Sequence, residues 1–155
     1  MIDRRTILGL ILAAIPASAC AKPARATDLQ VYKSPHCGCC GAWVEHVKAS
    51  GLKVTVFETE LGPDIQDKLR VPTNVRSCHT AEVDGYFVEG HVPAPDIRKL
   101  LRERPKARGI AVPGMPIGSP GMEQGDRRDA YDTLLVAEDG STRVFVSHNR
   151  PVGGE

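Results

Sequence analysis

Three cysteines lie within four positions of the chain, Cys37-Gly38-Cys39-Cys40, between a β-type run and a helix-type run. The β-type run is Leu29-Gln30-Val31-Tyr32, and the helical pattern begins near Gly41 or Ala42. A helix start exposes unpaired N–H groups and the positive end of the helix dipole, so it favours the thiolate form of a cysteine over the thiol. Because a thiolate is both a nucleophile and a metal ligand, disulfide exchange and soft-metal binding are both open here.

The residues around this motif predict a βαβ unit. Leu29–Lys33 and Val54–Glu58 have the composition of strands, and residues 42–50 carry apolar side chains at helical spacing. A C-x-x-C spacing beside a βαβ pattern is typical of thioredoxin-like redox motifs, and Cys37 and Cys40 have that spacing. The remaining cysteine of the motif is an extra thiol inside it.

The rest of the chain predicts a helix, a hairpin, a second helix and a closing hairpin. The helices are expected at residues 63–69 and 93–104, and the hairpins at residues 80–89 and 133–147. Residues 110–125 are dense in Gly and Pro and hold two Gly-Met pairs, which predicts a functional loop without regular structure. This element order predicts an α/β class, with a thioredoxin-like fold, a Gly/Pro/Met-rich loop and a C-terminal β-hairpin.

The N-terminus has the order of a bacterial secretory signal. Arg4 and Arg5 precede an apolar stretch at Ile7–Ala19, which is shorter than the ~20 residues that cross a bilayer. Residues 1–26 are therefore expected to be a signal peptide and residues 27–150 the folded domain, exported to the periplasm. Cys20 follows Ala17-Ser18-Ala19, which resembles a weak lipoprotein site, so a lipid anchor at Cys20 is the alternative to simple release.

Removal of the signal leaves four thiols in an oxidising compartment: Cys37, Cys39, Cys40 and Cys78. Two structural disulfides are one interpretation of that set. A closely spaced trio is poor at closing long loops, however, and long loops are where a disulfide stabilises a fold most.

Composition and missing motifs exclude other classes of function. The formal net charge is +1 and no basic stripe interleaved with aromatic residues is present, so no nucleic-acid partner is expected. The sequence shows neither a Ser-His-Asp arrangement nor a phosphate-binding glycine loop, and we assign no catalytic residue.

The stretch Cys78–Gly90 resembles the part of glutaredoxins and thioredoxins in which a cis-proline precedes a strand and a turn. Aligned at Asp84-Gly85, the cis-proline position falls at or near His79, where this chain has Cys78-His79 instead. In thioredoxins this proline limits metal binding at the cysteine pair. Its replacement by two ligand residues favours a metal site over a redox enzyme.

Four motifs together resemble the CopG family of periplasmic copper-resistance proteins, over the region from about Leu29 to Val146. They lie at Ser34–Cys40, Ser77–Ala81, Val88–Pro93 and Val112–Glu123. The resemblance implies a thioredoxin-like fold, a multinuclear copper cluster bridged by cysteine, and a role in copper handling that includes copper redox chemistry.

Ligand chemistry then favours copper over zinc. Thiolates suit Cu(I), zinc and Fe–S clusters, but structural zinc usually takes two separated cysteine pairs, whereas three of these four thiols come from one turn. The candidate metal ligands are Cys37, Cys39, Cys40, Cys78, His36, His79, Met115 and Met122. His36 has the alternative role of capping the helix or tuning a thiol pKa, and the methionines have that of core packing. His91 falls close to the same end of the fold. Because His79 directly follows Cys78, only one of them is expected to face the cluster.

Three functional hypotheses follow. The first is a periplasmic copper-binding protein in copper resistance, holding Cu(I) in a multinuclear site and cycling it between Cu(I) and Cu(II). The second is a thiol–disulfide oxidoreductase in which Cys37 attacks and Cys40 resolves. The third is a metallochaperone with a periplasmic copper donor or acceptor protein as its partner. The sequence leaves enzymatic turnover open.

Overall fold

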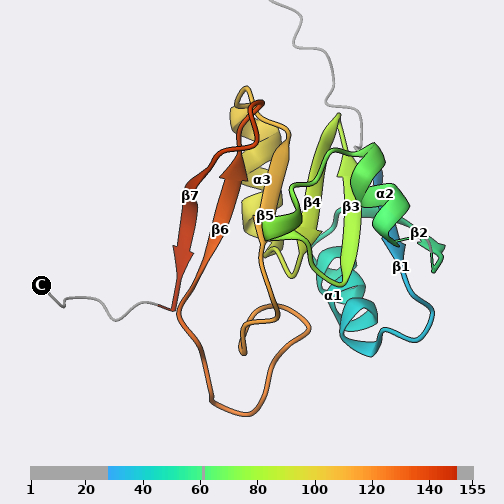
Figure 1. The fold of residues 1–155 in the computed structure, drawn as a ribbon. Helices are drawn as coiled ribbons and strands as arrows, with labels where there is room; N and C mark the ends of the chain where they lie inside the picture. The colour runs from blue at the N-terminus through green and yellow to red at the C-terminus, as the bar shows by residue number, and fades with distance from the viewer. Residues whose placement is uncertain (1–27, 61, 150–155) are drawn as a thin grey trace, which may run out of the picture.

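The computed structural model describes residues 28–60 and 62–149, which form one mixed sheet with helices packed on it (Figure 1). The sheet has seven strands in the order β2-β1-β3-β4-β5-β6-β7. The strands are β1 (Asp28–Lys33), β2 (Lys53–Glu58), β3 (His79–Val83), β4 (Tyr86–Gly90), β5 (Gly109–Val112), β6 (Tyr131–Val136) and β7 (Thr142–His148). The helices are α1 (Gly38–Ala49), α2 (Gly62–Lys68), α3 (Ala94–Glu103) and a short 3-10 turn, η1 (Thr73–Val75). The predicted α/β class is confirmed. The expected signal at residues 1–26, with Cys20, lies outside the described residues.

Strand pairing follows the local sequence signals. β1 and β2 run parallel because α1 crosses between them, as the predicted βαβ unit requires. β3 and β4 pair antiparallel through Asp84-Gly85, where both residues adopt positive φ, 49° and 83°. A two-residue hairpin loop needs that conformation, which Gly adopts freely and Asp tolerates. β6 and β7 also pair antiparallel, so the predicted C-terminal hairpin is confirmed.

The helix after the cysteine motif starts earlier than the sequence indicated. It begins at Gly38 rather than near Gly41, and Cys37 is its N-cap, with an extended backbone at φ −84° and ψ 95°. The Cys37 carbonyl accepts the Gly41 N–H at 3.2 Å, which closes the first turn. Cys40 is fully buried, so tertiary packing of this turn overrides the poor helix propensity of Gly38.

The predicted loop at residues 110–125 also needs a correction, because its first residues form β5. All four residues of β5 are buried, and the strand pairs parallel with β4 and antiparallel with β6. A Cβ at Gly109 would lie 2.2 Å from the Phe87 carbonyl oxygen, so this close approach requires glycine. Four residues ahead of Pro113 are too short a run to show a strand period in sequence.

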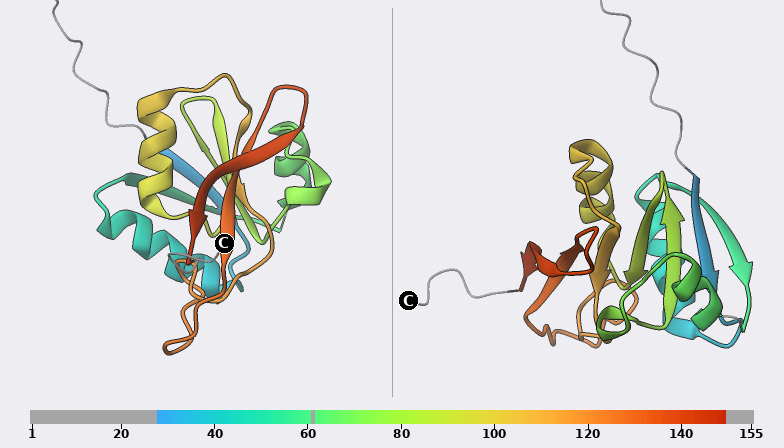
Figure 2. Two further views of the ribbon diagram at one scale, coloured as in Figure 1. Left: turned by 90° about the vertical axis from the view of Figure 1, so that its left-hand side faces the viewer. Right: turned by 45° about the horizontal axis from the view of Figure 1, so that its top comes forward.

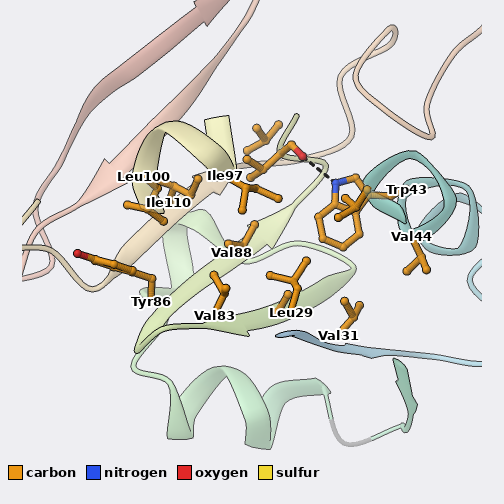
Figure 3. Close-up of a cluster of buried hydrophobic side chains, with 14 of the residues drawn as sticks. Leu29, Val31, Trp43, Val44, Val83, Tyr86, Val88, Ile97, Leu100 and Ile110 are labelled. Carbon is orange, nitrogen blue, oxygen red and sulfur yellow. Dashed lines mark hydrogen bonds between the residues drawn. The ribbon is translucent and has the colours of Figure 1, made fainter. Parts of the chain in front are cut away.

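The helices cover the two faces of the sheet unequally. α1 and α3 lie against one face and α2 lies against the other (Figure 2). The larger core cluster contains side chains from α1, α3 and the sheet, among them Leu29, Val31, Trp43, Val88 and Ile97 (Figure 3). Burying each large apolar side chain of this kind stabilises the fold by about 1.5–3 kcal/mol. A smaller cluster holds Val71, Val75 and Phe87.

Strand directions bring distant segments to one end of the sheet. Lys33, the last residue of β1, is paired with His79, the first residue of β3, and Thr80 is paired with Glu89 near the end of β4. The β1–α1 junction, the start of β3 and the end of β4 therefore meet at this end. Because β5 runs parallel to β4, the long loop after it begins there too. Among the described residues, no helix has the length and apolar character needed to span a bilayer.

Candidate metal and thiol site

Four cysteine sulfurs converge at this end of the sheet. Cys37 caps α1, Cys39 and Cys40 lie in its first turn, and Cys78 directly precedes β3. The four Sγ atoms all lie within 4.8 Å of one another. The sequence motif and the distant cysteine were thus correctly predicted to be neighbours.

In this structure Cys37 and Cys40 form a disulfide, with Cα atoms 5.3 Å apart. Cys39 and Cys78 are the free thiols of the described residues, and both are half-buried. The Cys39 sulfur lies 3.5 Å from that of Cys37, and the Cys40 sulfur lies 3.7 Å from the Cys78 carbonyl oxygen. The extra thiol, Cys39, therefore lies in contact with the C-x-x-C pair.

Cys78 also contacts two imidazoles. Its sulfur lies 3.4 Å from His79 Nδ1 and 3.3 Å from His91 Nε2, and these three ligand atoms form a second compact group. Cys78 therefore belongs to both groups, whereas His79 belongs only to the group with His91 and not to the four-sulfur group. Cys78 lies outside the strand, so the strict alternation of side chains does not separate it from His79.

Burial favours the neutral form of both imidazoles. Burial, and then repulsion from the neighbouring His91 imidazole in its protonated form, lower the pKa of His79 to about 3, and burial lowers the pKa of His91. His91 Nδ1 lies 2.9 Å from the buried Pro120 carbonyl oxygen, so Nδ1 carries the proton and Nε2 presents its lone pair to Cys78. His79 Nε2 is buried and has no hydrogen-bond partner in the described part of the chain. Neutral imidazole is the form that binds metals.

Cys78 holds its proton more tightly than an exposed thiol. Burial, and then the neighbouring Cys39, raise the pKa of Cys78 to about 11. A metal that binds this sulfur must therefore displace a proton.

The other predicted ligands lie around the cluster. His36 is exposed beside the motif. Met122 is half-buried and follows Gly121, at which a Cβ would lie 2.7 Å from the Cys39 carbonyl oxygen. Met115 is 55% exposed and follows Gly114, whose carbonyl oxygen accepts the Ser77 hydroxyl at 3.0 Å. The loop after β5 therefore approaches the site twice, once beside Cys39 and once beside Ser77.

Sequence reasoning did not assign two residues of this region. His91 was placed at this end but not counted as a ligand, and the buried Glu89 was not considered. Burial, opposed by hydrogen bonds from Thr80, Ser77 and Gln66, raises the pKa of Glu89 to about 7. The sequence signal that could have identified both His91 and Glu89 is the segment Glu89-Gly90-His91. In it, charged and polar residues directly follow the apolar run of a central strand.

A pocket of about 230 Å³ opens beside Cys78 and His79. Lys33, Gln66 and Thr80 are among the residues that line it. The arrangement supports two kinds of chemistry: dithiol–disulfide exchange at Cys37 and Cys40, and, once that disulfide is reduced, binding of a soft metal by sulfur and imidazole.

Comparisons with known proteins show the family of the chain. Residues 75–122 match the family model described as "Protein of unknown function, DUF411". No curated protein matches the chain. Two solved structures titled "Copper resistance protein copG", Form 2 and Form 1, are each 47% identical to it, with a TM-score of 0.75. The alignments cover 79% and 78% of this chain and 98% and 96% of those chains. The chain therefore belongs to the CopG family of copper resistance proteins.

Proposed function

We propose that this chain is a periplasmic copper-binding protein of copper resistance, which holds Cu(I) through Cys37, Cys39, Cys40 and Cys78. One observation carries the proposal: four sulfurs converge within 4.8 Å in a chain of the CopG family. Thiolates are soft ligands that select Cu(I), and imidazole also suits copper. His79 Nδ1 and His91 Nε2 lie beside the Cys78 sulfur and would add imidazole nitrogens to the sulfur ligands.

The proposed site is multinuclear. Cys78 belongs both to the four-sulfur group and to the group that it forms with His79 and His91, so its sulfur would bridge two ion positions. Three sulfurs from one turn would crowd a single tetrahedral ion, whereas bridging thiolates spread over several Cu(I) ions. His91 thus joins the ligands proposed from the sequence. Met122 and Met115 would supply thioether ligands from the loop after β5. His36 would be a ligand at the exposed edge of the site.

Copper loading requires the Cys37–Cys40 disulfide to be reduced first, because the thiolate is the metal ligand.

The proposal includes export by residues 1–26, with Cys20 as the site of a lipid anchor if one is attached. It also includes cycling between Cu(I) and Cu(II), and a thioredoxin-like arrangement of residues 28–103. The βαβ unit followed by the β3–β4 hairpin and α3 supports that arrangement. Delivery to a periplasmic copper acceptor is the metallochaperone form of the same proposal.

The test is metal analysis of the protein purified anaerobically from copper-fed cells, with a free-thiol count. We expect several copper ions per chain with the thiols protected, and fewer for Cys39→Ser. Glu45→Gln, an exposed change on the same helix, is the matched control and should retain the full copper count. An unchanged count in Cys39→Ser would rule out a cluster that uses all four thiols.

The disulfide favours a second function, thiol–disulfide exchange with Cys37 as the attacking thiolate and Cys40 as the resolving one. Insulin reduction measures it. In that case Cys37→Ser abolishes the activity and Cys39→Ser retains it. A wild-type protein with no reductase activity would eliminate this function.

A further inference from the structure

Glu89 is a buried carboxylate in the strand that ends beside the thiol site. It lies on β4, its side chain is 0% exposed, and none of the ion pairs found among the described residues includes it. Burying an ionisable group without a cation is costly unless hydrogen bonds satisfy its oxygens. The retention of a carboxylate here therefore needs a reason beyond packing.

Three donors surround the carboxylate, and two of them bracket Cys78-His79. Oε1 accepts the Ser77 backbone N–H at 2.6 Å and the Gln66 side-chain amide at 2.7 Å. Oε2 accepts the Thr80 hydroxyl at 2.6 Å. Ser77 directly precedes Cys78-His79 and Thr80 directly follows it. Glu89 thus holds both ends of the two-residue segment that carries the sulfur and an imidazole.

The neighbouring contacts fix the same segment. The Gln66 amide also donates to the Ser77 carbonyl oxygen at 3.2 Å, so Gln66 and Glu89 together hold the main chain of Ser77. At Gly90 a Cβ would lie 2.8 Å from the Ser77 side chain and 2.6 Å from the Val112 carbonyl oxygen. The segment before Cys78 therefore lies directly on the end of β4.

We infer that Glu89 is a positioning residue, which fixes Cys78 and His79 toward the α1 thiols and His91 and so tunes copper affinity; this rests on the proposed copper function. The Ser77 N–H and the Gln66 amide can only donate, so Oε1 of Glu89 must accept from both, and the Thr80 hydroxyl donates to Oε2. A glutamine could keep its oxygen on Ser77 and Gln66 but would turn its N–H₂ group toward the Thr80 hydroxyl, which must then rotate to accept, and an apolar residue would leave the Ser77 N–H and the Thr80 hydroxyl without partners.

The test compares the full chain with Glu89→Gln and Thr80→Val, and uses Glu82→Gln as the matched control. Glu82 is a half-buried carboxylate on the adjacent β3. Cu(I) affinity is measured by competition with a chromophoric chelator, together with the Cu–thiolate absorption band and the thermal unfolding midpoint. Loss of a partner behind a metal ligand typically costs about 10- to 100-fold in affinity. We expect a loss of about that size for Glu89→Gln with a shifted band, a smaller loss for Thr80→Val, and none for Glu82→Gln.

Alkylation of Cys78 in the metal-free, disulfide-closed protein gives a readout that does not depend on copper. Peptide mass spectrometry should show a several-fold change in the Cys78 rate relative to Cys39 in Glu89→Gln. If the wild type takes up no copper but this rate changes, the proposed function fails and the positioning role stands. Should Glu89→Gln not fold, Thr80→Val decides by the same measurements. Wild-type affinity and alkylation in the folded variants would overturn the inference, as would a lower unfolding midpoint with an unshifted absorption band.

Discussion

The indole ring of Trp43 packs against the imidazole of His79, with ring centroids 4.4 Å apart and planes inclined at 42°. Both side chains are buried, and Trp43 Nε1 donates to the Val92 carbonyl oxygen at 2.8 Å. Figure 3 shows this hydrogen bond beside the main core cluster. The single tryptophan of the chain therefore touches both the core and a candidate metal ligand.

Copper loading should reduce Trp43 fluorescence. A metal ion bound at His79 lies next to the indole, so emission should fall in proportion to bound copper until the site is full. A fluorescence titration of the reduced protein with Cu(I) measures this, and removal of copper with a chelator should restore the signal. His148→Asn changes a histidine outside the candidate ligand set and should leave the quenching intact. Constant emission during confirmed copper uptake would place the metal away from His79.

Gly121→Ala should destabilise the protein more than Gly114→Ala. Both glycines have positive φ, 83° and 71°, so alanine carries a left-handed cost of about 1–2 kcal/mol at either position. Only at Gly121 would the new Cβ meet backbone atoms, 2.7 Å from the Cys39 oxygen and 2.8 Å from the Trp43 nitrogen. At Gly114 nothing lies within 4 Å.

The loop must therefore move away from α1 in Gly121→Ala, which should add about 1 kcal/mol or more to the loss of unfolding free energy. Urea unfolding of the two variants under identical conditions checks this difference. Faster alkylation of Cys39 in Gly121→Ala, but not in Gly114→Ala, should accompany it. Equal stability of the two variants would mean that the loop does not press on α1.

The fold could be predicted where the sequence carries local signals. The Asp84-Gly85 and Asp139-Gly140 dipeptides marked the hairpins, and apolar spacing marked α1 and α3. β5 was not predicted from the sequence because it is only four residues long. Its pairing with β4 and β6 defines it, and no local sequence pattern encodes that pairing. The residues on either side of β5 do not show whether this short buried run is a strand or part of a loop.

The candidate site divides in the same way. Residue chemistry predicted the thiols of the motif, and the resemblance to the cis-proline position of thioredoxins predicted the Cys78-His79 pair beside them. The position of His91 next to Cys78 depends on the ends of β3 and β4 meeting and on a carbonyl from a distant loop, Pro120. The proposed positioning role of Glu89 depends on three hydrogen-bond donors that are spread over residues 66–80. Such relationships arise from tertiary packing, so periodicity and spacing do not reveal them.

Met122→Leu should weaken Cu(I) binding more than Met115→Leu. Leucine is close to methionine in volume, so neither change should cost more than about 1.5 kcal/mol of stability. Met122 is half-buried beside the glycine that contacts Cys39, whereas the Met115 side chain is 55% exposed. Competition with a Cu(I) chelator compares the two variants directly. Wild-type affinity in both would leave the methionines with a packing role only.

The unfolding free energy should fall at alkaline pH through Tyr131. Its ring stacks on His148, with centroids 4.6 Å apart, near Asp96, which His148 contacts at 2.9 Å. Burial, followed by the charges of Asp96 and Glu123, raises the pKa of Tyr131 from 10.0 to about 12. The folded protein therefore keeps the phenol proton between pH 10 and 12, whereas the unfolded chain loses it.

Because the folded state binds more protons in that interval, the stabilising contribution of Tyr131 is fully present below pH 10 and is lost as the pH rises through 12. Tyr131→Phe has no phenol to ionise, so its unfolding free energy should fall less between pH 9 and pH 11 than that of the wild type. Urea unfolding at the two pH values, under reducing conditions, measures both slopes. Identical slopes would show that Tyr131 ionises equally readily in the folded and unfolded states. Burial of Tyr131 and the charges of Asp96 and Glu123 would then have no effect on its proton.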